Sequence, residues 1–208
     1  IKPKTDAAFL YALIHAMLHE HPRTRLDLPF LTRHTSSPYL VGPHGYYLRD
    51  PSSGKPLVFD TVRGAAVPFD TPGAQPALEG PHCVERSLEL GPDADRWEHR
   101  DVTAETAFGK LVDHVRTYTP EWAAGVCDVP AQRIRSVANE YLEHARVGAT
   151  VEVEGRTLPL RPVAIILGKT VNNGWGAFDC VWARTLLAVL VGALEVPGGI
   201  LGTTVRIN

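Results

Sequence analysis

A helix that is apolar on nearly every face lies within the first twenty residues of the chain. Residues 7–20 read AAFLYALIHAMLHE, and their apolar side chains cover most of the helix circumference instead of one stripe. Such a helix must be buried on all sides, which is unusual near the end of a small domain. We therefore expect residues 1–208 to be an internal fragment of a larger subunit.

Charge, hydropathy and cysteine spacing argue against several classes of protein. The formal net charge is −2, so no nucleic-acid-binding surface is indicated. No run of about 18 apolar residues is present, so no direct membrane span is expected. Cys83, Cys127 and Cys180 form no CxxC pair. We interpret them as reduced, mostly buried thiols that hold neither zinc nor an iron–sulfur cluster by themselves.

Residues 22–100 are rich in Pro, Gly, Asp and Ser. Two strand-like runs, 46–48 and 56–59, flank the turn signal DPSSGK, which predicts a β-hairpin. The remainder, 61–100, is expected to be irregular. A loop of that length is easier to understand as an excursion over the surface of a larger protein.

Ordered elements return in residues 101–208. Thr119 is a predicted helix cap, with Pro120 in the first helical position and Gly125 at the end. The predicted elements are helices at 103–118, 119–125 and 130–145, and a hairpin that turns at Glu154-Gly155.

A strand, a loop and a helix are predicted at 162–194. PVAIILG (162–168) is continuously apolar, as expected of a strand buried on both faces. A polar loop (169–178) and a helix (179–194) follow it. Ligands bind in α/β proteins at the carboxyl end of such strands.

Three familiar motifs are incomplete. GKT at 168–170 lacks the glycine that a P-loop requires, because Val163 occupies that position. His15 and His19 have the spacing of a zinc pair with His21 nearby, but Ala16 stands where a zincin has glutamate. We interpret these histidines as ordinary helix residues and predict no metal ligand. GxSxG is absent, and no catalytic residue is predicted.

The corner PKTD (3–6) has two interpretations. Thr5 or Asp6 can cap the helix that follows. Alternatively, the Asp6 carboxylate can accept two hydrogen bonds from the edge of a guanine base.

PKTD followed by an Ala-rich apolar helix resembles a motif of the molybdopterin oxidoreductase family, of the dimethyl-sulfoxide-reductase type, in which the corner is usually PGTD. SPYLVGPHGYYLRD with KPLVFD resembles the hairpin of that family, and TPEWAAGVCDVPAQRIRSVANEY resembles its helix pair. RPVAIILGKTVNNGWGAFDCVWARTLLAVLVGALEVPGG resembles its strand, loop and helix. The hairpin VEVEGRTLPLRPVA makes the likeness closest to the branch of tetrathionate, polysulfide and phenylacetyl-CoA-type oxidoreductases.

The resemblance implies an α/β fold, with partial three-layer cofactor-binding domains and a β-hairpin excursion. Residues 1–21 would end one α/β domain, 22–100 would form the excursion, and 101–208 would contribute to an α/β domain. The parent would be an oxidoreductase with molybdenum on two molybdopterin guanine dinucleotides (bis-MGD) and a 4Fe–4S cluster.

The resemblance also implies the site residues and partners. The cofactor-binding residues would be Thr5, Asp6, Lys169, Asn172, Asn173 and Gly174. Asp6 would bind guanine while Thr5 supports the turn, Lys169 would meet a phosphate, and the side chains of Asn172 and Asn173 would reach the pterin. Asn-Asn-Gly as a simple turn is the other interpretation of that loop. One partner would be the remainder of the catalytic subunit, and another would be an iron–sulfur electron-transfer subunit. The location would be the cytoplasm or periplasm, or a membrane reached through partner subunits.

Several family features are missing. Many relatives have His-Thr-Asn-Gly where this chain has Val171-Asn172-Asn173-Gly174, so no role of that histidine carries over. The CxxCxxxC segment, the segment with the metal ligand and the carboxyl-terminal barrel are not in the sequence, so the isolated segment is expected to be inactive. The alternatives are a freestanding α/β ligand-binding module with a complete sheet, and a structural segment without cofactor contact.

Overall fold

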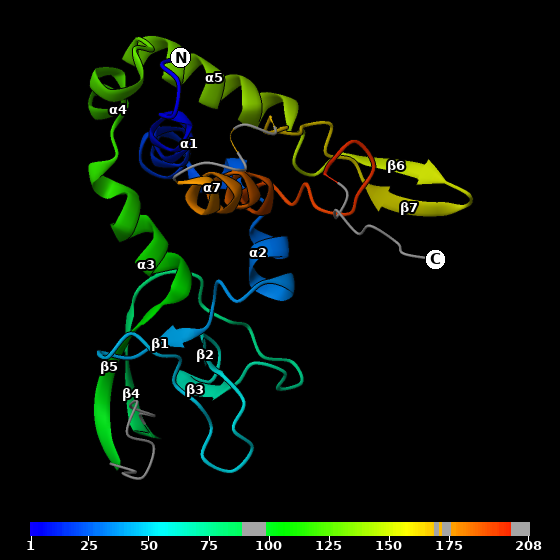
Figure 1. Cartoon of the computed structure of the whole chain (residues 1–208). Coiled ribbons are helices and arrows are strands. Elements are labelled where there is room, and N and C mark those ends of the chain that lie inside the picture. The colour runs from blue at the N-terminus through cyan, green and yellow to red at the C-terminus, as the bar shows by residue number, and fades with distance from the viewer. Residues whose placement is uncertain (89–98, 169–170, 172–175, 201–208) are drawn as a thin grey trace, which may run out of the picture. The chain divides into compact units, whose positions relative to one another are not determined.

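The chain divides into two compact units (Figure 1). In this computed structural model, unit 1 contains residues 1–30 and 114–208, and unit 2 contains residues 31–113. The structure describes residues 1–88, 99–168, 171 and 176–200, with the backbone alone at 85–88 and 99–101. Helices and small sheets occur together, so the predicted α/β class is confirmed.

The apolar segment at 7–20 is helical, as predicted. α1 (Asp6–His15) continues without a break into a π-helical turn (Ala16–Glu20). The side chains of Ile14 and Met17 have no exposed surface. α1 packs against three later helices of unit 1, α4 (Pro120–Cys127), α5 (Ala131–His144) and α7 (Ala177–Leu190). The burial that this segment requires is therefore supplied largely by the second half of the same chain.

α4 begins as predicted but ends later. The Thr119 hydroxyl accepts a hydrogen bond from the N–H of Trp122 at 3.2 Å, and Pro120 is the first helical residue. The prediction that Gly125 ends the helix is wrong. Asp128 takes the left-handed conformation (φ 56°) that closes it, so Gly125 lies inside.

The predicted helix at 130–145 and the predicted hairpin that turns at Glu154-Gly155 are both confirmed. The stripe of α5 that is buried consists of Ile134, Ala138 and Leu142. The hairpin consists of β6 (Thr150–Val153) and β7 (Arg156–Pro159). Glu154 (φ 50°) and Gly155 (φ 74°) are both left-handed, as a tight turn between two antiparallel strands requires.

The apolar run at 162–168 is not a strand, which corrects the prediction. Among the described residues none pairs with it in a sheet, and the side chain of Ile166 is 91% exposed. A strand exists only where a neighbouring strand completes its hydrogen bonds. Apolar composition indicates that this run favours burial, but it does not supply the neighbour.

Arg161 joins separate segments of unit 1. Its guanidinium pairs with Asp27 at 2.7 Å and donates to the carbonyl oxygens of Val191 and Ala149, each at 3.0 Å. Gly192 (φ 68°) passes so close that an added Cβ would lie 2.5 Å from the Asp27 carboxylate. The chain after α7 is therefore fixed against the segment that precedes α2 (Leu28–His34).

Unit 2 contains two small antiparallel sheets, with strand orders β1–β5–β4 and β2–β3. The strands are β1 (Leu40–Val41), β2 (Leu57–Asp60), β3 (Ala65–Pro68), β4 (Pro81–Leu88) and β5 (His99–Thr106). The prediction that 61–100 is irregular is therefore wrong. The β4–β5 and β1–β5 pairings join residues far apart in sequence, which a local pattern does not reveal.

The turn DPSSGK forms, but the strand after it pairs differently from the prediction. The N–H of Asp50 donates to the carbonyl of Lys55 at 2.8 Å, which closes the turn. β2 then forms its ladder with β3, while residues 46–48 make only isolated bridges and single hydrogen bonds. α3 (Ala107–His114) follows β5 and begins later than the predicted helix, because 103–106 belong to the strand.

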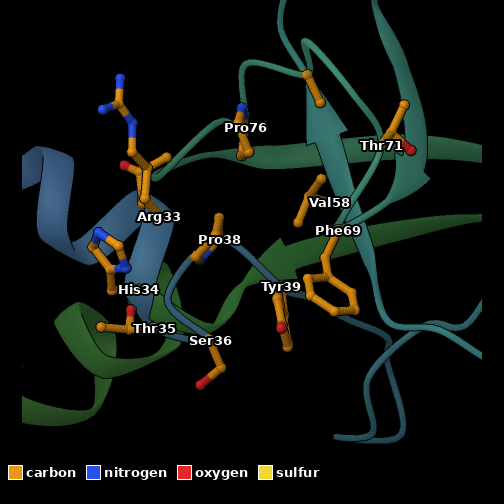
Figure 2. A pocket seen from close by; sticks show the side chains of 12 residues that line it. Arg33, His34, Thr35, Ser36, Pro38, Tyr39, Val58, Phe69, Thr71 and Pro76 are labelled. Carbon is orange, nitrogen blue, oxygen red and sulfur yellow. The ribbon is translucent and has the colours of Figure 1, made fainter.

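Unit 2 has its own core and a cavity. The buried core residues are Leu40, Leu48, Leu57, Val84, Val102 and Ala104. A cavity of about 500 Å³ lies between the end of α2, β2 and the loop after β3 (Figure 2).

Across the described ranges of the chain, no helix combines the length and the apolar character that a membrane crossing requires.

Candidate functional site

The corner before α1 is held by the end of α4. The N–H of Lys2 donates to the carbonyl of Cys127 at 2.9 Å, and Lys4 is left-handed (φ 69°). The Thr5 hydroxyl donates to the carbonyl of Lys2 at 2.6 Å, and the Thr5 N–H lies 3.3 Å from the same oxygen. The predicted PKTD corner is therefore a closed turn that fixes the start of α1 in unit 1.

The prediction that Thr5 or Asp6 caps α1 is right about the position of Thr5 and wrong about a side-chain cap. Thr5 occupies the N-cap position, but its hydroxyl is directed to Lys2 and accepts no hydrogen bond from the helix. Asp6 is the first helical residue and partly buried, and within the described part of the chain its carboxylate makes no hydrogen bond or ion pair. Its acceptor oxygens are therefore available.

The start of α7 lies beside this corner. Burial raises the pKa of the Cys180 thiol, and the charges of Asp6 and Asp179 raise it further. A hydrogen bond with the backbone of Ala7 acts in the opposite direction. Two carboxylates, Asp6 and Asp179, thus act on one thiol at the start of α7. The Asp6 carboxylate can accept hydrogen bonds from a group that presents donors.

An aromatic cluster extends from this corner. The Tyr11 ring lies 4.9 Å from Tyr118 and 6.0 Å from Trp182, measured between centroids, and Tyr118 lies 5.1 Å from Trp122. Burial raises the pKa of Tyr11, and the charge of Asp179 adds to this effect. The sequence does not reveal this cluster, because its rings come from α1, α4, α7 and the residue before the α4 cap. The Tyr118–Trp122 spacing is no helical signal, because Tyr118 precedes the N-cap of α4.

The second predicted group, Lys169, Asn172, Asn173 and Gly174, lies outside the described residues. Its role stays a prediction.

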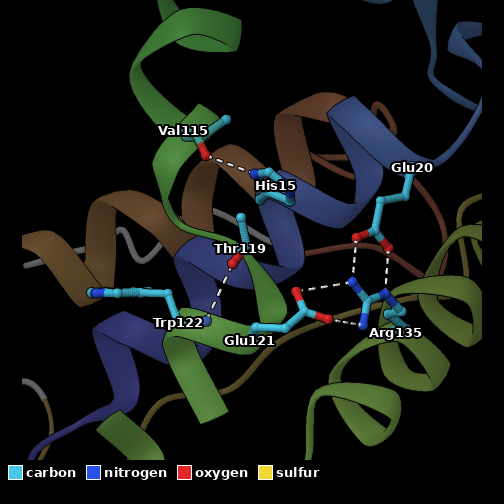
Figure 3. A network of polar contacts seen from close by, with 7 residues as sticks. All are labelled: His15, Glu20, Val115, Thr119, Glu121, Trp122 and Arg135. Atoms are coloured by element: carbon cyan, nitrogen blue, oxygen red, sulfur yellow. Dashed lines mark hydrogen bonds and ion pairs between the residues drawn. The ribbon is translucent and has the colours of Figure 1, made fainter. Parts of the chain in front are cut away.

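A charged network joins the far end of the α1 segment to α4 and α5 (Figure 3). The Arg135 guanidinium contacts both carboxylate oxygens of Glu20, each at 2.8 Å, and those of Glu121 at 2.6 and 3.1 Å. Hydrogen bonds with Glu20 and then Glu121 raise the pKa of Arg135, and the pKa of Glu121 is lowered in return. The donors of Arg135 are thus largely satisfied by protein groups, so we interpret this network as structural.

The histidines of the α1 segment stack instead of converging on a common point. The ring centroids of His15 and His19 lie 4.7 Å apart, and the ring planes meet at 28°. His15 Nδ1 lies 2.9 Å from the carbonyl oxygen of Val115 (Figure 3). Over the residues that the structure describes, no three His, Cys, Asp or Glu side chains are grouped in a way that suits a metal ion.

Comparison with known proteins relates this chain to oxidoreductases. No family model matches it. The chain is 26% identical, over 96% of its length, to a sulfite dehydrogenase subunit of Allochromatium vinosum. It is 33% identical, over 44% of its length, to a trimethylamine-N-oxide reductase of Vibrio parahaemolyticus. The matched regions span 21% and 9% of those proteins.

Proposed function

We propose that this chain is a segment of the catalytic subunit of a molybdenum-dependent oxidoreductase, and that Asp6 binds the guanine of a molybdopterin guanine dinucleotide. The observation that carries the proposal is the Asp6 carboxylate, which begins α1 and makes no hydrogen bond or ion pair with another described residue. The likeness to the sulfite dehydrogenase of Allochromatium vinosum along nearly the whole chain supports the class.

The chemistry of the corner fits guanine better than phosphate. Guanine presents an N1–H and an exocyclic amine side by side, which match the two oxygens of one carboxylate. A bare helix N-terminus suits an anion, but the carboxylate of Asp6 at the first helical position opposes one there. Each charge-assisted hydrogen bond contributes about 1.5–3 kcal/mol. When bound, the cofactor supplies two-electron chemistry with oxygen- or sulfur-atom transfer, while this chain binds and orients it.

The rest of the proposal concerns groups outside this chain. Other parts of the enzyme would supply the metal ligand, a 4Fe–4S cluster and an iron–sulfur partner subunit. A freestanding module is less well supported, because residues 162–168 have no sheet partner in the described chain. A structural segment without cofactor contact is the competing function.

We expect Asp6→Asn in the full-length subunit to weaken retention of the guanine-containing cofactor tenfold or more. The asparagine amide replaces one acceptor with a donor that faces the donors of guanine, and a tenfold change corresponds to about 1.4 kcal/mol. Molybdenum content and the guanine nucleotide released on denaturation are measured per subunit.

Asp128→Asn is the matched control, because Asp128 is exposed in unit 1 and asparagine tolerates its left-handed backbone. This control should retain the cofactor. If Asp6→Asn folds normally and keeps wild-type cofactor content, the guanine assignment is wrong and the structural function is favoured.

A further inference from the structure

The cavity of unit 2 has an apolar wall of aromatic and proline side chains. Figure 2 shows Pro38, Val58 and Pro76 around one space, with the rings of Tyr39 and Phe69 beside it. The Tyr39 and Phe69 ring centroids lie 5.4 Å apart, and the Tyr39 and Tyr47 centroids are separated by the same distance. A volume of about 500 Å³ is within the range of about 300–1,000 Å³ found for small-molecule sites.

Hydrogen bonds hold these walls in place. The carbonyl of Tyr39 accepts from Ala107 at 2.8 Å, and Tyr39 forms a bridge with Val58. On the other side, the loop after β3 is closed by bonds from Thr71 to Pro68 at 2.9 Å and from Ala74 to Thr71 at 3.1 Å. Binding there would require little ordering of the backbone.

The rim of the cavity is positive where α2 ends. Arg33 lines the cavity and is exposed, and it makes no hydrogen bond or ion pair with another described residue. Ser36 and Thr71 also line it, and their hydroxyls make no side-chain hydrogen bond with another described residue. These groups are donors, and a guanidinium matches a carboxylate in a two-point contact.

The carboxylates nearest these walls in sequence are already paired. Asp70, which follows Phe69, lies 2.5 Å from the Lys55 ammonium, and Asp60 pairs with Arg63. Each of these negative charges is balanced by a neighbouring positive charge. Asp60 and Asp70 therefore repel an anion bound near Arg33 only weakly.

We propose that this cavity binds a flat aromatic acid, with its ring body against Phe69, Pro38 and Pro76 and its carboxylate at Arg33. The site lies in unit 2, whereas Asp6 lies in unit 1, and the proposal does not depend on the molybdenum assignment.

The test is calorimetric titration of the purified protein with 2-naphthoate, and with 2-naphthamide, which has the same rings without the charge. Saturable binding of naphthoate at one site, at least tenfold tighter than naphthamide, is expected. Arg33→Gln should weaken naphthoate at least tenfold and leave naphthamide unchanged. Arg156→Gln, on the exposed strand β7, is the matched control and should change neither.

A second variant tests the apolar wall. Phe69→Ala should weaken naphthoate and naphthamide alike, since it removes a ring contact and no charge. Inorganic sulfate should bind at least tenfold more weakly than naphthoate. The proposal is overturned by an absence of naphthoate binding, by equal binding of acid and amide, by sulfate binding as tight as naphthoate, or by an Arg33→Gln variant with wild-type affinity.

Discussion

Asp60 is a buried carboxylate that organises the turn between β2 and β3 and the loop that follows. One oxygen accepts from the N–H groups of Val62 at 2.9 Å and Gln75 at 3.3 Å, and the other pairs with the Arg63 guanidinium. Burial raises the pKa of Asp60, but these hydrogen bonds outweigh it, so the pKa lies below its usual value.

Unit 2 should therefore lose stability in acid through Asp60. The unfolded carboxyl, with a pKa of about 4, binds its proton at higher pH than the folded one. The contribution is fully present above that pKa and is lost as pH falls through the lower, folded-state pKa. Urea unfolding between pH 2 and 6 should show a shallower acid dependence in Asp60→Asn than in wild type. Equal slopes would show that Asp60 does not contribute.

At the scale of one element, two threonines in the same helix position behave differently. Thr119 and Thr5 are both N-cap residues, but only Thr119 accepts a hydrogen bond from its helix. Thr5 bonds backward to Lys2 at an exposed site. A threonine at the start of a helix predicts a cap. The turn before the helix decides whether the threonine hydroxyl is free to accept a hydrogen bond from a helix N–H.

Thr119→Ala should lower the free energy of unfolding by about 1 kcal/mol, within the range of about 0.5–2 kcal/mol for lost caps. Thr5→Ala should cost less, because no helix N–H loses an acceptor. Urea unfolding of both variants measures the difference. A larger loss for Thr5→Ala would contradict the geometry of this corner.

Helices followed local sequence signals better than strands did. The positions of α5 and the 7–20 segment were predictable because the pattern of apolar residues lies within the element. The strand predicted at 162–168 failed because a strand also requires a neighbour. The strands within 61–100 were not predicted because their partners could not be identified from the sequence. Some partners are distant in sequence, and others lie across turns that composition alone did not define.

The candidate site shows the same limit. PKTD pointed to Thr5 and Asp6, and the structure places Asp6 where its acceptors are available. The aromatic cluster around Tyr11 was not predictable, because Tyr118 and Trp182 approach it from separate segments. The charge of Asp179, which acts on Cys180 and Tyr11, likewise comes from α7.

At the scale of the whole molecule, each unit has a separate core. Leu48→Ala should destabilise unit 2 by about 2–5 kcal/mol, because Leu48 has no exposed surface and its loss leaves a cavity. Hydrogen exchange should show reduced protection in β2 and β5, with the buried amides of α1 unchanged. Val62→Ala, 70% exposed in the same unit, is the control and should leave both unchanged. An equal loss of protection in α1 would show that the two units unfold together.

The sequence by itself determined the apolar helix at 7–20, the Thr119 cap, the β6–β7 turn and the corner that presents Asp6. Each depends on residues close together in the chain, where propensity and hydrogen bonding act directly. Only the tertiary structure decided what buries α1, which strands pair in unit 2, and which groups surround Asp6 and the unit 2 cavity. Those outcomes depend on contacts between distant segments, and no local pattern encodes such a contact.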